Sequence, residues 1–127
     1  WNRILEDDPR NKVILTRAGD AYRNTGDYKT AAEYYNRAMD IDFDIYAALG
    51  LALICKGEGK YQEAIDRLKR LIQDDERNYR LYIDLADCYV KIGQKQNAIE
   101  TLQSFGKQGI RCQPISEMLE KLQSPKL

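Results

Sequence analysis

The groups with the strongest intrinsic chemistry in this sequence are three thiols and two short runs of carboxylates. Cys55, Cys88 and Cys112 lie far apart, form no Cys-x-x-Cys pair, and there is no histidine to complement them. A zinc site needs a set of such ligands at close spacing, so these residues do not predict one. The acidic runs at 6–8 and 74–76 fall at expected turns and are better explained as solvated residues than as metal ligands. With no nucleophile–base pair either, we expect no catalytic residue, no metal and no cofactor.

The nine tyrosines raise a second possibility, because exposed aromatic rings can stack on nucleic-acid bases. However, lysine plus arginine equals aspartate plus glutamate, at 20 each, so the composition shows no basic excess. Tyr22, Tyr35 and Tyr89 also recur at places expected to be in a core. We therefore attribute the tyrosines to packing and expect no nucleic-acid partner.

The composition also bears on location. No apolar run approaches membrane-spanning length, and the start has no signal-peptide pattern, so we expect no direct membrane insertion. The odd number of cysteines favours a reducing compartment, and hence a cytoplasmic location. Since the chain opens on Trp1 and not on methionine, we expect a piece of a longer protein.

Any functional surface must be positioned by a repeat of about 34 residues. The stretch Gly26–Ala32 recurs as Gly59–Ile65 and again as Gly93–Ile99, with the glycines 33 and then 34 residues apart. A period of this length is typical of paired antiparallel helices. The glycine would end the first helix of each pair, where a left-handed backbone is accessible to it. Small residues, such as Gly19 and Ala31 in the first unit, would let the two helices cross closely.

This pattern predicts seven helices, at 12–25, 28–41, 45–57, 61–74, 79–92, 95–105 and 114–123. They form one domain over 1–127: the end of a truncated preceding repeat (1–11), three repeats (12–44, 45–78, 79–112), and a capping helix with a tail (113–127). One register stays open, because the second repeat can place either Leu51–Ala52 or Leu49–Gly50 at the helix crossing. The first choice needs fewer changes in length.

The matched positions resemble the tetratricopeptide-repeat family. In the first repeat they are Leu15, Ala18–Gly19, Tyr22, Gly26, Ala31, Tyr35 and Ala38; in the third they are Tyr82, Leu85–Ala86, Tyr89, Gly93, Ala98 and Leu102. The usual Trp at the first place and Pro near the end are missing. The resemblance implies an all-α fold, a right-handed α-solenoid of antiparallel helix pairs. It also implies a protein–protein interaction scaffold or adaptor.

In such arrays the first helices of successive repeats line a concave groove that takes a peptide or helix of a partner. By matched position, the groove residues here would be Val13, Thr16, Asp20, Arg23, Tyr46, Leu49, Leu53, Lys56, Arg80, Ile83, Asp87 and Val90. An alternative is that Tyr46, Leu49 and Leu53 belong to a helix buried on every side.

One branch of the family holds the carboxylate end of a chaperone peptide with a clamp of Lys, Asn, Asn, Lys and Arg. The matching places here are Thr16, Asp20, Gly50, Arg80 and Asp84, of which only Arg80 is basic, so we do not expect that ligand.

Two other functions remain open. The truncated helix that begins at Trp1 could pair with a second copy, which would make the chain a structural self-assembly module and a homo-oligomer. Alternatively, the chain could be the docking domain of a larger enzyme.

Overall fold

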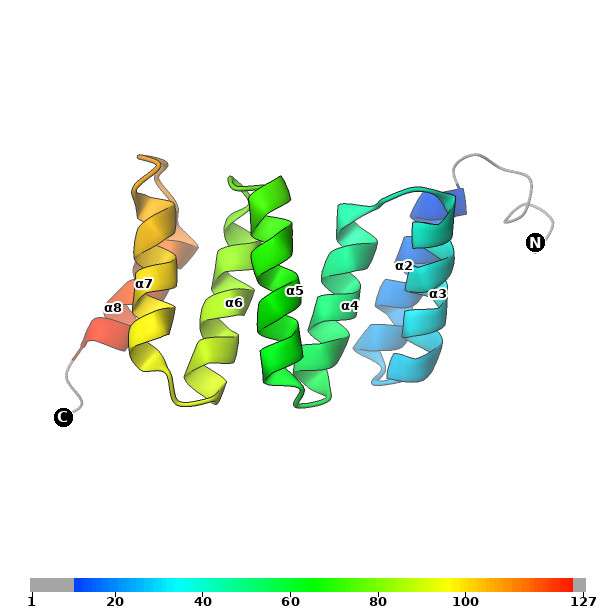
Figure 1. Cartoon of the computed structure of the whole chain (residues 1–127), viewed down its shortest axis with the longest axis horizontal. Helices are drawn as coiled ribbons and strands as arrows, with labels where there is room; N and C mark the ends of the chain where they lie inside the picture. Colours follow the sequence, from blue (N-terminus) through cyan, green and yellow to red (C-terminus); the bar gives the residue numbers. More distant parts are fainter. Residues whose placement is uncertain (1–10, 125–127) are drawn as a thin grey trace. The chain divides into compact units, whose positions relative to one another are not determined.

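The computed structural model describes residues 11–124, and the regular structure in that range is helical (Figure 1). The helices are α2 (Asn11–Asn24), α3 (Tyr28–Ile41), α4 (Ile45–Gly57), α5 (Tyr61–Asp74), α6 (Tyr79–Lys91), α7 (Lys95–Gly106) and α8 (Gln113–Gln123). Each predicted boundary is confirmed to within one residue. The expected helix at Trp1, and the contact between copies that depends on it, lie outside the described residues.

The turn inside each repeat depends on the backbone freedom of glycine. Gly26, Gly59 and Gly93 have φ values of 88°, 80° and 79°. A Cβ built on any of the three would meet no atom within 4 Å, so the left-handed backbone, and not a lack of space, favours glycine there. These turns confirm the periodicity read from the sequence.

Helix starts use short polar side chains as caps. Asp27 accepts a hydrogen bond from the Thr30 amide at 3.2 Å, and Asn78 accepts one from the Arg80 amide, also at 3.2 Å. Each satisfies an amide that the helix itself leaves unpaired.

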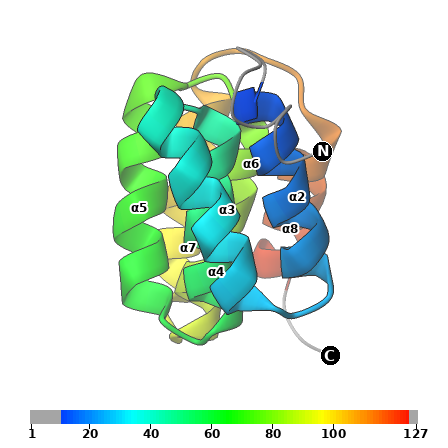
Figure 2. The same ribbon diagram turned by 90° about the vertical axis from the view of Figure 1, so that its right-hand side faces the viewer.

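By its packing the chain divides between Glu58 and Gly59 into two compact units. The N-terminal unit contains α2 and α3, an antiparallel pair, and α4, which contacts both (Figure 2). Its core is made of apolar side chains that the three helices share: Leu15, Ala31, Tyr35, Ala38, Ala47 and Ile54.

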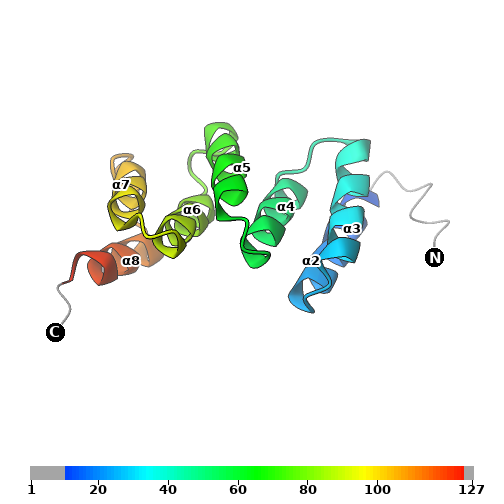
Figure 3. The same cartoon turned by 60° about the horizontal axis from the view of Figure 1, so that its bottom comes forward.

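The C-terminal unit contains α5 to α8. Helix α6 contacts α5, α7 and α8, and α8 also contacts α7 (Figure 3). Leu81, Leu102 and Cys88 are fully buried, and the rings of Tyr82 and Phe105 meet edge to face with centroids 5.1 Å apart. Cys88, like Cys55 in the N-terminal unit, is buried, as predicted for a small apolar side chain.

The loop between α7 and α8 is tied to this unit. Gln108 Nε2 donates to the carbonyl of Glu76 at 2.8 Å, and the Tyr82 hydroxyl donates to the same carbonyl at 2.8 Å. The Glu76 carbonyl, in the turn before α6, therefore holds both the Tyr82 side chain on α6 and the loop that follows α7.

Candidate functional site

A pocket of about 420 Å³ opens between α2 and the start of α4 in the N-terminal unit. Its lining residues are Lys12, Val13, Thr16, Arg17, Asp20, Asp44 and Tyr46. Four of them, Val13, Thr16, Asp20 and Tyr46, are predicted groove residues. The structure thus brings together part of the predicted site.

The apolar part of this pocket is Val13 on α2 and Tyr46 on α4. Val13 is 47% exposed and Tyr46 is 66% exposed. Large apolar side chains left this open gain free energy when another molecule covers them. They are the strongest attraction that the pocket offers to an apolar ligand group.

The polar floor of the pocket joins α2 to the N-terminus of α4. Thr16 and Asp44 are both buried, and Thr16 Oγ1 donates to Asp44 Oδ2 at 2.8 Å. The other oxygen, Asp44 Oδ1, caps α4 by accepting from the Tyr46 amide at 2.9 Å. Both carboxylate oxygens are therefore engaged inside the protein, and the positive end of the α4 dipole stabilises the charge.

On the α2 side, two groove residues are held by the core. The Tyr35 hydroxyl donates to Asp20 Oδ1 at 2.5 Å and accepts from Arg23 Nε at 3.1 Å. Asp20 and Arg23 also form an ion pair at 3.7 Å. Burial, reinforced by the hydrogen bond to Asp20, raises the pKa of Tyr35 to about 12. Asp20 and Arg23 thus already satisfy each other.

Two glycines make room for the Tyr35 ring. A Cβ at Gly19 would lie 2.6 Å from Tyr35 Cε1, and a Cβ at Gly50 would lie 2.2 Å from Tyr35 Cζ. Gly19 is predicted at a close crossing with the second helix, opposite Ala31, and the Tyr35 ring that an added Cβ would meet belongs to that same helix, α3. Gly50 likewise packs against the Tyr35 ring of the preceding repeat. Ala52 is fully buried and precedes Gly59 by the same interval at which Gly19 precedes Gly26, as in the preferred register of the second repeat.

The remaining predicted residues of α4 divide between surface and core. Leu49 is buried at 9% exposure, whereas Leu53 and Lys56 are half-buried. The alternative of a helix buried on every side therefore describes Leu49 but not Tyr46. Thr16, described above, is also core and not open surface.

The predicted residues of α6 belong to the C-terminal unit. Arg80 and Val90 are exposed, and Ile83 and Asp87 are half-buried. Val90, at 37% exposure, is the apolar side chain of this set most open to solvent. Their role as groove residues stays a prediction.

Three residues of the pocket lining are not among the predicted groove residues: Lys12, Arg17 and Asp44. Lys12 Nζ lies 3.7 Å from Asp42 and 3.4 Å from the Phe43 carbonyl, which ties α2 to the turn before α4. Asp44 stands directly before the first residue of α4, and that position is a sequence signal for a cap. Arg17 gives no such signal, because its place in the pocket depends on the packing of α4.

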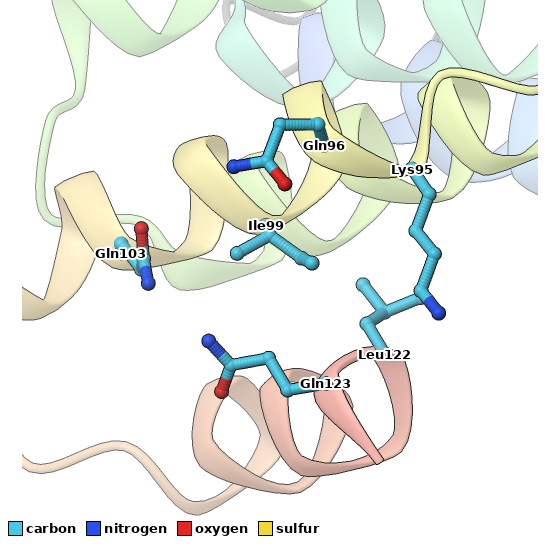
Figure 4. Close-up of a pocket in the computed structure, with 6 residues that line it drawn as sticks. All are labelled: Lys95, Gln96, Ile99, Gln103, Leu122 and Gln123. Carbon is cyan, nitrogen blue, oxygen red and sulfur yellow. The ribbon is translucent and has the colours of Figure 1, made fainter. Parts of the chain in front are cut away.

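A second depression, of about 580 Å³, lies between α7 and α8. Figure 4 shows its lining residues, Lys95, Gln96, Ile99, Gln103, Leu122 and Gln123. Only Ile99 and Leu122 are apolar, and both are half-buried. Because it exposes little apolar surface, it is the weaker candidate of the two.

Among residues 11–124, no three or more Cys, Asp or Glu side chains are placed to hold a metal ion. None of the described helices combines the length and the apolar composition that a membrane crossing requires.

Comparison with known proteins gives consistent matches. Two tetratricopeptide-repeat models match residues 14–45 and 57–109, together well over half of the chain. Human tetratricopeptide repeat protein 16 is 23% identical over 105 residues, which are 72% of this chain but only 12% of that protein. Superkiller protein 3 of Schizosaccharomyces pombe is 26% identical over 77% of this chain and 7% of its own length. The chain therefore spans a small part of these relatives.

Solved structures agree on the fold. PcrH from Pseudomonas aeruginosa superposes with a TM-score of 0.77 at 18% identity, covering 90% of this chain and 92% of PcrH. The second such domain of human RPAP3, solved in complex with an HSP70 peptide, has a TM-score of 0.73 at 18% identity. That match covers 92% of this chain and 99% of the domain. At these identities the likeness establishes antiparallel helix pairs packed in the same way.

Proposed function

Because this chain belongs to the tetratricopeptide-repeat family, we propose that it is a protein–protein interaction module, a scaffold or adaptor, and not an enzyme. The first helices would bind a peptide or helix of a partner protein. The observation that carries this proposal is the pocket between α2 and α4, where Val13 and Tyr46 remain open to solvent. The peptide-bound RPAP3 domain, which shares the fold, supports this use of it.

The pocket suits one apolar anchor of a partner. Its volume of about 420 Å³ accommodates a large side chain with part of its backbone. Tyrosine is among the residues that most often dominate binding energy at interfaces, and removing such a residue typically costs ~2 kcal/mol. We therefore expect Tyr46→Ala to weaken partner binding by about 30-fold.

The binding surface would also include predicted first-helix residues outside the pocket. In the N-terminal unit these are Arg23, Leu53 and Lys56; in the C-terminal unit, the predicted residues Arg80, Ile83, Asp87 and Val90 would form a surface of that unit on α6.

The test compares partner capture from a native cell extract by the wild-type chain and by Val13→Ala/Tyr46→Ala. Both side chains are exposed, so the double variant should fold normally, whereas a charge at buried Leu49 would disrupt the core. Lys29→Ala, on the exposed first turn of α3, is the matched control.

Loss of the same partner with the double variant only, at equal helicity by circular dichroism, is the expected result. Retention of every partner by the double variant would show that this pocket is not the binding surface.

A further inference from the structure

The charges around the α2–α4 pocket are unequally satisfied. Of the carboxylates, Asp44 is occupied by Thr16 and by the Tyr46 amide, and Asp20 is occupied by Tyr35 and Arg23. Asp42, at the turn before α4, pairs with Lys12 and accepts from the Phe43 amide at 2.8 Å. Each of these three carboxylates is thus already engaged within the described part of the chain, and none of them is left to attract a basic ligand group.

The cations differ in this respect. Lys12 is engaged with Asp42 and the Phe43 carbonyl, and Arg23 with Asp20 and Tyr35. Arg17 lines the pocket, is exposed, and forms no ion pair with any residue from 11 to 124. Among the residues that the structure describes, the one charge that the pocket offers to a partner is therefore the Arg17 guanidinium.

We infer that the peptide bound here carries an aspartate or glutamate beside its apolar anchor, and that Arg17 binds that carboxylate. This inference rests on the proposed function. The anchor covers Val13 and Tyr46, and the guanidinium one helical turn beyond Val13 faces the neighbouring peptide residue. Guanidinium and carboxylate match geometrically in a bidentate pair, and partial desolvation in the interface strengthens it.

The carboxylate belongs to a side chain and not to the C-terminus of the peptide. The N-terminal unit has Thr16, Asp20 and Gly50 at the places where the family's clamp holds a terminal carboxylate. None of these is basic, and Asp20 would repel it. A lysine or arginine in the peptide would have to displace Arg23 or Lys12 from an existing ion pair.

The test selects binders from a phage-displayed library of random peptides on three proteins in parallel: wild type, Arg17→Glu and Lys29→Glu. Lys29→Glu reverses an exposed charge in α3 outside the pocket and is the control. Wild type and control should select an apolar residue with Asp or Glu at a fixed spacing. Arg17→Glu should keep the apolar residue and replace the acid by Lys or Arg.

A synthetic peptide from the wild-type pool should bind Arg17→Glu about tenfold more weakly, and a peptide with its acid changed to Lys should recover most of that loss. The affinity of the wild-type pair should fall with salt. If the peptides selected on wild type share an apolar residue but carry no Asp or Glu at a fixed spacing from it, the inference is overturned and the proposed function stands. Peptides that bind Val13→Ala/Tyr46→Ala as well as wild type, or the absence of any binder, would overturn both.

Discussion

Replacing Gly50 by alanine should destabilise the protein, although alanine is the better helix former. Gly50 lies inside α4, and an added Cβ would stand 2.2 Å from Tyr35 Cζ and 2.6 Å from both Cε atoms. Real carbon contacts start beyond 3 Å, so the ring or α4 would have to move. The Tyr35 side chain cannot yield easily, because it is fully buried and its hydroxyl is bonded to Asp20 and Arg23.

The expected change in the free energy of unfolding on Gly50→Ala is the sum of two opposing terms. Overpacking of a buried site costs about 1–3 kcal/mol. Changing glycine to alanine in a helix interior returns up to ~1 kcal/mol. Given how tightly Tyr35 is fixed, we expect a net loss of about 2 kcal/mol, which is about 8 °C at roughly 4 °C per kcal/mol for a chain of this length.

The assay is urea unfolding followed by circular dichroism, in a double-mutant cycle with Tyr35→Leu. Leucine is the residue that the second and third repeats carry at this place, as Leu68 and Leu102. A smaller side chain at position 35 should remove the overpacking cost of Gly50→Ala and leave only the gain in helix propensity, giving a coupling free energy of about 3 kcal/mol. Gly106→Ala is the control, because a Cβ there meets nothing within 4 Å, and it should be neutral or slightly stabilising. The reasoning fails if Gly50→Ala costs the same with leucine at 35 as with tyrosine.

Two further predictions concern the same unit. The pKa of Tyr35 is about 12 in the folded protein against 10.0 in the unfolded chain, so the unfolded state loses its proton first. The associated stability is complete below pH 10 and is lost between pH 10 and 12; Tyr35→Phe should flatten that part of the pH dependence in urea titrations, and an unchanged slope would refute the assignment. Asp44→Ala removes the cap of α4 and the acceptor of Thr16, and should cost ~1–2 kcal/mol. Asp44→Asn retains an acceptor and should cost less in the same unfolding assay; the reverse order would contradict this role.

The helices could be predicted to within one residue because their signals are local. Periodic apolar residues, turn glycines and helix caps all act within about four residues along the chain. Each of these signals occurs in three repeats, so the turns at Gly26, Gly59 and Gly93 could be predicted from one shared pattern. The family assignment rests on the same periodicity, which the matches to residues 14–45 and 57–109 confirm.

The lining of the α2–α4 pocket was predicted only in part, because it depends on contacts between residues far apart in the sequence. Thr16 meets Asp44, 28 residues away, and this contact buries a residue that the helical pattern places on the groove face. The contact of Gly19 with the Tyr35 ring also joins two helices, α2 and α3. A signal for this contact was present, since Gly19 is matched with Tyr35 where the other repeats match Ala52 with Leu68 and Ala86 with Leu102. The smaller first residue is paired with the larger second one, as expected when the two side chains fill the same space between the helices.

The tyrosine at position 35 also links the core to the chemistry of the surface. Leu68 and Leu102, at the same place in the other repeats, have no polar atom with which to reach a first helix. The Tyr35 hydroxyl does reach α2, where it holds Asp20 and, through it, Arg23. Arg17 is the charge of the pocket that has no ion-pair partner within the part of the chain that the structure describes. Under the proposed function, this packing residue also influences which ligand charge the first repeat attracts, and replacing Tyr35 should change both stability and peptide preference.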